Sequence, residues 1–154
     1  MWLGRDENIR QAVNLARENV AMYGGTGTGK SYRVQQLVEG WSGPVVALGV
    51  EPTLEFQPEA TVLRRLHVGQ VEADPSGAIA AIVATVAHRG GHTPLIVVEA
   101  TDWSDKGVVS ALVAALGTGA RVLAVGQTLP NEITEAVDCM VETRPGFEVD
   151  LTRH

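Results

Sequence analysis

The sequence feature that most constrains the fold is an octapeptide near the start of the chain, Gly24-Gly25-Thr26-Gly27-Thr28-Gly29-Lys30-Ser31. It matches the P-loop pattern G-x-x-x-x-G-K-[ST] at every fixed position. Glycines allow backbone conformations that are closed to residues with a Cβ atom, so successive N–H groups can turn inward around a phosphate. A working P-loop must leave a buried strand and enter a helix. The octapeptide therefore requires a strand before it and a helix after it.

Both flanks of the P-loop (residues 24–31) meet this requirement. Residues 19–23 form a short, mostly apolar run that is typical of a strand. Residues 31–39 follow with apolar side chains at positions 34, 37 and 38, which is helical spacing. Gly40 and residues 42–44 supply the stop signal for that helix. A glycine-rich turn that matched the pattern by chance would lack this context, and we interpret the octapeptide as a nucleotide-phosphate site.

The pattern assigns a role to each part of the loop. Lys30 is expected to place its ammonium group against the β- and γ-phosphates, and the Ser31 hydroxyl is expected to ligate Mg²⁺. The two threonines are expected to act mainly through their backbone N–H groups. The predicted nucleotide-binding set is Gly24, Gly25, Thr26, Gly27, Thr28, Gly29, Lys30, Ser31 and Tyr32.

Composition and charge limit the class of protein. The chain of 154 residues has the length of one domain, predicted to span residues 1–154. A net charge of −6 argues against a dedicated nucleic-acid-binding surface, which usually carries a basic excess. The single cysteine, Cys139, cannot form an internal disulfide and is predicted to be a buried thiol. No secretory signal or apolar run of membrane-spanning length is visible, so a cytoplasmic location is expected.

The remaining sequence alternates between strand-like and helix-like segments. Continuous apolar runs, typical of strands buried on both faces, cover residues 44–50, 94–99 and 121–127. An edge strand is predicted over residues 61–68, and a terminal hairpin over residues 138–141 and 147–151 that turns at residues 144–146. Helices are predicted over residues 5–18, 76–88, 105–116 and 130–137. This alternation predicts an α/β fold in which helices cover both faces of a mainly parallel sheet.

Two polar side chains end buried strands and should therefore lie near the P-loop, because ligands of parallel sheets bind at the carboxyl ends of the strands. Glu99 is predicted to activate the attacking water as a base or to hold Mg²⁺ through a bound water. Gln127 either orients that water and senses the γ-phosphate, or satisfies backbone groups in the turn that follows. Asp102 either caps the next helix together with Ser104 or contacts the metal or the water.

Three stretches resemble the additional-strand P-loop ATPases, and among them the FtsK–HerA superfamily of DNA-translocating motors. They are residues 23–31, residues 95–100 and residues 122–130, the last ending in a Gln followed shortly by Pro. The resemblance implies a three-layer αβα fold with a sheet ordered 5-1-4-3-2. It also implies ATP with Mg²⁺, hexameric rings and the translocation of DNA. ATP is the default nucleotide because the guanine-selecting pattern [NT]-K-x-D does not occur.

The chain departs from this family at the second stretch. The family strand usually ends in Asp-Glu, with the Asp for Mg²⁺ and the Glu for water. In this chain the pair is Val98-Glu99 if the Glu is aligned, which we prefer, or Glu99-Ala100 if the Asp is aligned. One carboxylate is lost, which weakens the case for tight Mg²⁺ coordination and fast turnover. Arg89, Arg121 and Arg144 are candidates for an arginine that reaches the γ-phosphate of a neighbouring subunit.

Three functions are compatible with the sequence. The first is a minimal oligomeric ATPase that couples ATP hydrolysis to moving or packaging DNA. The second is a non-motor nucleotide-binding module whose ATP occupancy controls assembly with a partner. The third is a small phosphotransferase, which is disfavoured because Arg64, Arg65 and Arg89 are too scattered to resemble the arginine-rich lid of a nucleotide kinase.

Overall fold

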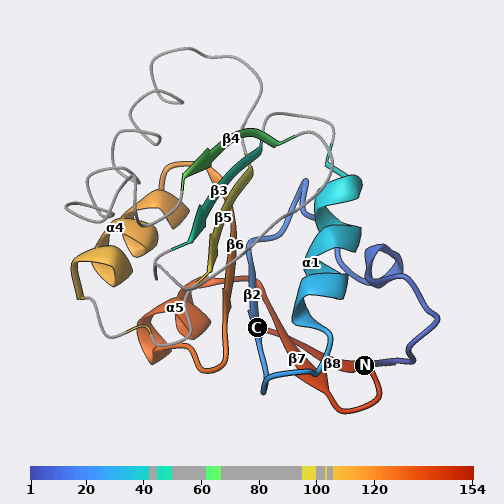
Figure 1. Cartoon of the computed structure of the whole chain (residues 1–154). Coiled ribbons are helices and arrows are strands. Elements are labelled where there is room, and N and C mark those ends of the chain that lie inside the picture. Colours follow the sequence, from blue (N-terminus) through green and yellow to red (C-terminus); the bar gives the residue numbers. More distant parts are fainter. Residues whose placement is uncertain (42–44, 50–61, 67–94, 100–102, 104–105) are drawn as a thin grey trace.

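The computed structural model describes residues 1–41, 45–49, 62–66, 95–99, 103 and 106–154, and it places a single sheet between helices (Figure 1). The predicted helix over residues 76–88 lies outside the described residues, as do Arg89 and Asp102. The described elements are β1 (Trp2–Leu3), η1 (Ile9–Gln11), β2 (Val20–Tyr23), α1 (Lys30–Glu39), β3 (Val45–Gly49), β4 (Val62–Leu66), β5 (Leu95–Glu99), α4 (Lys106–Leu116), β6 (Arg121–Gly126), α5 (Asn131–Ala136), β7 (Cys139–Arg144) and β8 (Glu148–Arg153).

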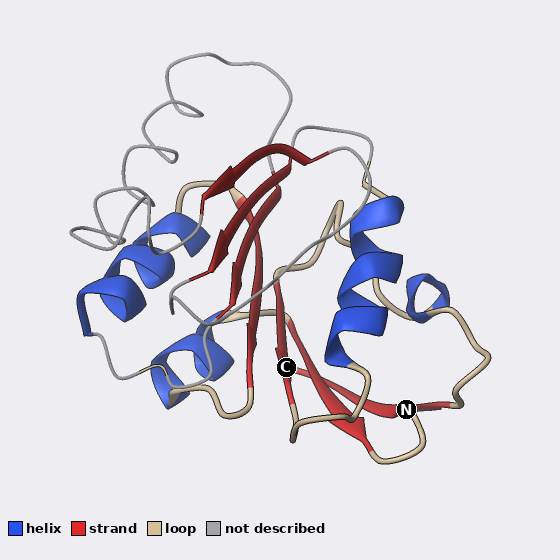
Figure 2. Cartoon of the chain, in the orientation of Figure 1, coloured by secondary structure: helices blue, strands red, loops and turns tan. Residues whose placement is uncertain are grey.

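The sheet is mixed, with a parallel body and an antiparallel margin (Figure 2). Its strand order is β1-β8-β7-β2-β6-β5-β3-β4. The pairs from β7 through β2, β6, β5 and β3 to β4 are all parallel. The pairs β7–β8 and β1–β8 are antiparallel. The C-terminal hairpin predicted from the sequence is confirmed, and its first strand pairs with the strand that leads into the P-loop.

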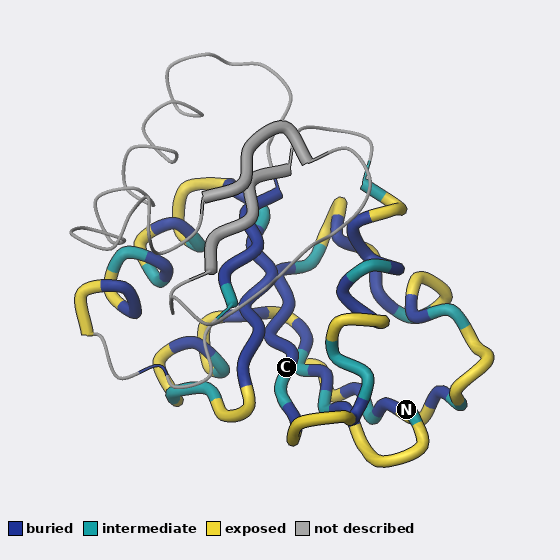
Figure 3. The backbone as a smooth tube through the Cα atoms, in the orientation of Figure 1, coloured by how far each residue is buried: buried dark blue, intermediate teal, exposed yellow. Residues whose placement is uncertain are grey.

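Side chains of the central strands point alternately to the two faces of the sheet, as the pleat of a strand requires. In β2, Val20 and Met22 pack in the same core cluster as the buried residues of α1, whereas Ala21 packs in the cluster that holds α4 and α5. The described residues of β5 and β6 follow the same alternation, and their buried positions appear as dark blue segments in Figure 3. Burial on both faces explains why these strands read as continuous apolar runs.

The helices are short, and each packs an apolar side onto the sheet. α1 has 10 residues, α4 has 11 and α5 has 6. α1 buries Val34, Leu37 and Val38 on one face of the sheet, and α4 buries Val108 and Leu112 on the other. Among the described residues, no helix is long and apolar enough to cross a membrane.

The helix predicted over residues 5–18 is wrong. Within this segment, all of which is described, the structure has the short 3-10 helix η1 and turns. The carboxamide oxygens of Asn8 and Asn14 each accept the backbone N–H two residues further on, both at 3.0 Å. Such local side-chain bonds compete with the helical hydrogen-bond ladder. Its large apolar residues, Ile9, Val13 and Leu15, are nevertheless buried, whereas Ala16 is exposed.

A buried arginine supplies a second reason for the irregular N-terminal segment. Arg33, in α1, is 0% exposed and donates to the carbonyl oxygens of Gly4 at 2.8 Å, of Glu7, and of Phe147 at 2.8 Å. It also donates to the side chain of Gln36 at 3.1 Å. The carbonyls of Gly4 and Glu7 are thus bound by a guanidinium rather than by helical amides. Arg33 joins α1 to both the N-terminal segment and the turn of the C-terminal hairpin.

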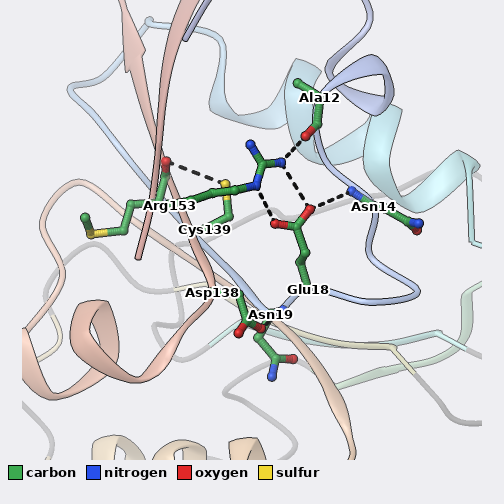
Figure 4. Close-up of polar contacts among 8 residues, drawn as sticks. Ala12, Asn14, Glu18, Asn19, Asp138, Cys139 and Arg153 are labelled. Atoms are coloured by element: carbon green, nitrogen blue, oxygen red, sulfur yellow. Dashed lines mark hydrogen bonds and ion pairs between the residues drawn. The ribbon is translucent and has the colours of Figure 1, made fainter.

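A polar cluster joins the segment before β2 to the last strand, β8 (Figure 4). Arg153 contacts both carboxylate oxygens of Glu18, at 2.7 Å and 3.1 Å, and also donates to the carbonyl of Ala12. Nearby, the backbone N–H of Asn19 donates to the carboxylate of Asp138 at 2.8 Å. These contacts fix the start of the P-loop strand against the C-terminal hairpin.

This cluster gives the stability of the fold a pH dependence. The hydrogen bond from Arg153 lowers the pKa of Glu18 below its ordinary value of 4.5. A lowered pKa stabilises the folded state fully above pH 4.5, and this stabilisation is lost as the pH falls through the lowered pKa. Because the pair is near the surface, we expect Glu18→Gln to lower the unfolding free energy by up to about 1 kcal/mol at pH 7. At pH 3 the difference should shrink.

Urea unfolding of the native chain and of Glu18→Gln at both pH values measures this effect. A difference of equal size at pH 7 and pH 3 would contradict the assignment to the ionised carboxylate.

The prediction that Cys139 is a buried thiol is confirmed. Cys139 is 0% exposed at the start of β7, and burial raises its pKa to about 11. A thiol with that pKa is protonated at neutral pH and behaves as a small apolar core residue.

Candidate functional site

The P-loop has the strand–loop–helix geometry that its sequence requires. β2 ends at Tyr23, and α1 begins at Lys30 with Gly29 as its N-terminal cap. Gly29 has a φ of +91° and Gly27 has a φ of +78°. These are left-handed conformations that glycine adopts without strain. The turn they make brings the unpaired N–H groups at the start of α1 to the mouth of the loop, where an anion is favoured.

The neighbouring strand β7 supports the base of the loop through Thr143. The Thr28 hydroxyl lies 2.7 Å from the Thr143 hydroxyl and donates to the carbonyl of Gly25 at 2.6 Å. A Cβ atom on Gly24 would collide with Thr143, reaching its carbonyl oxygen at 2.5 Å. Gly24 is therefore required for close packing of the loop against β7. Thr28 is buried here and does not line the cavity described below.

Lys30 folds back over its own loop. Its Nζ atom donates to the carbonyl oxygens of Gly24 at 2.7 Å and Gly25 at 2.8 Å. Partial burial lowers the pKa of Lys30, while the negative charge of Glu99 acts in the opposite direction. The ammonium is held by carbonyl oxygens, which carry only partial negative charge. Phosphate oxygens, which carry full negative charge, could take the place of these carbonyls.

A cavity of about 390 Å³ opens over the loop and collects most of the predicted site residues. This size is within the range of small-molecule sites. Gly24, Gly25 and Thr28 lie outside its lining, because they form the supported base of the loop. The lining residues are Thr26, Gly27, Gly29, Lys30, Ser31, Tyr32, Glu99, Gly126, Gln127 and Phe147.

Glu99 and Gln127 reach this cavity from the ends of adjacent strands. Glu99 is the last residue of β5, and Gln127 directly follows β6. The Gln127 side chain donates to the Thr26 hydroxyl at 2.8 Å, so it contacts the P-loop directly. Val98 is 0% exposed on the opposite face of the sheet, where it packs with α4, so it faces away from the site.

Of the three arginines predicted as candidates to reach the γ-phosphate of a neighbouring subunit, Arg121 and Arg144 lie in the described part of the chain. Arg121 begins β6, at the end of the strand opposite to the P-loop. Arg144 lies 2.6 Å from Glu142 and 3.7 Å from Asp150, and its guanidinium lies 4.9 Å from the ring centroid of Trp2. Arg144 is therefore engaged within its own sheet.

Sequence reasoning missed three residues of the site: Gly126, which lines the cavity, and Thr143 and Phe147. Phe147 is at the turn of the β7–β8 hairpin and packs against the P-loop, since a Cβ on Gly29 would lie 3.0 Å from its ring. Its φ of +61° is unusual for a residue with a bulky side chain. The sequence predicts the hairpin but contains no local signal that its first strand pairs with β2. The register that sets Tyr23 opposite Glu142 is what brings this turn to the loop.

The fold is shared with solved P-loop ATPases. The ATPase DotB of Legionella pneumophila superposes with a TM-score of 0.58 at 17% identity, over 88% of this chain and 43% of that chain. A prototypical ATPase from the type III secretion system of pathogenic bacteria gives a TM-score of 0.54 at 14% identity, over 83% and 51%. The chain thus spans about half the length of these two ATPases.

A third similar structure is of comparable size. A protein of Pyrococcus horikoshii OT3 superposes with a TM-score of 0.52 at 11% identity, over 98% of this chain and 92% of that chain. No protein-family model and no curated protein sequence matches the chain. The shared property is the fold, and the site must be interpreted from its own residues.

Proposed function

We propose that the chain binds ATP with Mg²⁺ over the P-loop and hydrolyses it. The observation that carries this proposal is the single cavity that brings Lys30, Ser31, Glu99 and Gln127 together over the loop. A cation and a hydroxyl at the start of a helix, together with a carboxylate and a carboxamide at the ends of neighbouring strands, are the groups that phosphoryl transfer to water needs. The fold shared with two ATPases supports the same conclusion.

The donor set at the cavity fits Mg²⁺ rather than a metal held by protein side chains alone. The described residues contain no group of three or more His, Cys, Asp or Glu side chains that could hold a metal. Mg²⁺ typically takes one or two protein oxygens, with waters and substrate phosphates completing its shell. Ser31 would supply its hydroxyl directly, and Glu99 would act through a water. Bound there, the ion would neutralise charge on the phosphate oxygens.

Each side chain has a separate task in the proposed reaction. Lys30 would exchange the carbonyls of Gly24 and Gly25 for phosphate oxygens, which places its charge on the transferred group. Glu99 would accept the proton of the attacking water while a new P–O bond forms and ADP leaves. Gln127 would orient that water from its position beside Thr26.

The strand order supports the narrower proposal of an additional-strand ATPase related to the FtsK–HerA superfamily. β6 lies between the P-loop strand β2 and the strand β5 that ends in Glu99. In this arrangement the P-loop strand and the strand of Glu99 are separated by an inserted strand, β6, which Gln127 directly follows. On this proposal the chain acts in an oligomer that moves or packages DNA.

One observation favours the alternative of a non-motor nucleotide-binding module. The residue before Glu99 is the buried Val98, so this strand contributes one carboxylate to the cavity. A site with a single carboxylate can bind a triphosphate through Lys30 and the loop amides and still turn over slowly. ATP occupancy would then control assembly with a partner.

Replacing Glu99 by glutamine separates binding from hydrolysis. We expect Glu99→Gln to lower the rate of phosphate release from ATP by about 10²- to 10⁴-fold, the usual contribution of a general base. Because glutamine keeps the size and polarity of the side chain, ATP affinity measured by calorimetry should change little. Glu132→Gln, on the exposed start of α5, is the matched control and should leave both quantities unchanged.

The outcomes distinguish the candidate functions. A native chain that binds ATP without releasing phosphate would favour the nucleotide-binding module. Unchanged hydrolysis in Glu99→Gln would contradict the role of Glu99 as the base. The same assay with double-stranded DNA added tests the narrower proposal that the chain moves or packages DNA. We expect DNA to increase the rate of ATP hydrolysis, and a rate that does not change with DNA would contradict this proposal.

A further inference from the structure

We propose that Phe147 and Tyr32 form the platform on which the base of the bound nucleotide stacks. This inference rests on the proposed function and adds the residues that recognise the nucleoside end of the ligand. Both aromatic side chains line the cavity over the P-loop. They come from different elements, since Tyr32 is in the first turn of α1 and Phe147 is in the turn of the β7–β8 hairpin.

The sheet order sets the direction in which a nucleotide lies. The P-loop follows β2, which has β6 and then β5 on one side and β7 and then β8 on the other. Glu99 and Gln127 are on the first side, so the terminal phosphate belongs there. The base must then extend from the loop toward the second side, where the hairpin turn carries Phe147. The positions of Glu99 and Gln127 therefore place the nucleoside end of the ligand beside the two aromatic side chains.

The two rings are arranged as an open surface. Their centroids lie 5.8 Å apart with an angle of 34° between the ring planes. Tyr32 is 41% exposed and is one of the large hydrophobic side chains that remain exposed in the described part of the chain. The guanidinium of Arg5 lies over the Phe147 ring at 5.2 Å from its centroid, and that of Arg33 lies over the Tyr32 ring at 5.3 Å, so each ring has a cation over one face. Flat aromatic faces beside a cation are a chemistry that stacks nucleobases with little sequence preference.

The conformation of Phe147 shows that its position is held from outside the turn. Its φ of +61° lies in a region that glycine occupies without strain and a phenylalanine disfavours. Arg33 holds the Phe147 carbonyl at 2.8 Å, and the ring packs against Gly29 of the loop. A glycine would satisfy the backbone of the turn as well or better. Compared with a glycine at this position, Phe147 adds only its phenyl ring, and this ring lines the cavity over the P-loop.

The test compares a ligand that carries a base with one that does not. Affinities for ATP and for inorganic tripolyphosphate, both with Mg²⁺, are measured by calorimetry for the native chain, Phe147→Gly and Tyr32→Leu. We expect Phe147→Gly to weaken ATP binding about tenfold, the effect of losing one stacked base, with tripolyphosphate binding unchanged. Tyr32→Leu keeps the apolar contact and removes the ring, and a loss of ATP affinity of about threefold to tenfold is expected.

Each result supports or overturns the inference. Selective weakening of ATP in either variant supports it, and Tyr32→Leu serves this purpose if Phe147→Gly does not fold. Equal weakening of ATP and tripolyphosphate would overturn it, because the hairpin turn would then act only by positioning the loop. Unchanged ATP affinity in both variants would overturn it as well. Lys30→Ala is included because unchanged binding of both ligands in that variant would overturn the proposed function itself.

Discussion

Replacing Lys30 by alanine is expected to weaken the binding of ATP by about hundredfold or more. The reason is the loss of the one ammonium group that lines the cavity, where it would make charge-assisted hydrogen bonds to phosphate oxygens. Each hydrogen bond to a charged group contributes about 1.5–3 kcal/mol, and about 1.4 kcal/mol corresponds to a tenfold change in affinity. Calorimetric titration with ATP and Mg²⁺ measures the change.

The chain offers a matched control for this variant. Its only other lysine is Lys106, which is exposed at the start of α4 and outside the cavity lining. Lys106→Ala removes the same charge from the protein and should leave the ATP affinity unchanged. Equal weakening in both variants would show that net charge, rather than the P-loop geometry, controls binding.

Arg33→Met should be among the most destabilising substitutions in the described part of the chain. The guanidinium is 0% exposed and satisfies the carbonyls of Gly4, Glu7 and Phe147 from one point. Methionine fills much of the volume but donates no hydrogen bond to these carbonyls, of which that of Gly4 alone keeps another donor within the described part of the chain, the backbone N–H of Glu7 at 3.2 Å. Each buried acceptor left unsatisfied costs about 1–3 kcal/mol, a large part of the net stability of a folded protein.

Urea denaturation measures this loss as a lower midpoint with an unchanged slope. Arg17→Met is the matched control, because Arg17 is exposed in the N-terminal segment and surface substitutions typically change stability by less than about 0.5 kcal/mol. A loss below about 1 kcal/mol in Arg33→Met would contradict the assignment of Arg33 as the junction of α1, the N-terminal segment and the hairpin.

The parts of the fold that follow from local sequence were predictable. The strand before the P-loop and the helix after it are set by adjacent apolar residues and by glycines in the loop, and both are observed. The apolar runs that became β5 and β6 were recognisable because both of their faces are buried. Their ends at Glu99 and Gln127 followed from the geometry of parallel strands, and the cavity contains both residues.

The parts that depend on distant contacts were not predictable. The Thr28–Thr143 contact joins residues 115 positions apart, and no local pattern indicates it. The segment 5–18 has apolar residues compatible with a helix, but the asparagine side chains and the carbonyl contacts of Arg33 select turns instead. The position of Phe147 beside the P-loop likewise depends on the pairing of β7 with β2.

These distant contacts have a common consequence for the site. The P-loop is supported by Thr143 from the hairpin, and α1 is tied to the same hairpin by Arg33. The C-terminal hairpin is therefore part of the proposed nucleotide site rather than an appendage to the sheet. Rigid support of this kind keeps the loop amides oriented before the ligand arrives, which reduces the cost of binding.

The binding of ATP over the P-loop can be observed in a crystal structure of the protein with Mg²⁺ and a non-hydrolysable ATP analogue. We expect Nζ of Lys30 to leave the carbonyls of Gly24 and Gly25 and to contact the phosphates, with the terminal phosphate on the side of Glu99 and Gln127. An analogue bound elsewhere, with Lys30 still on the loop carbonyls, would contradict it.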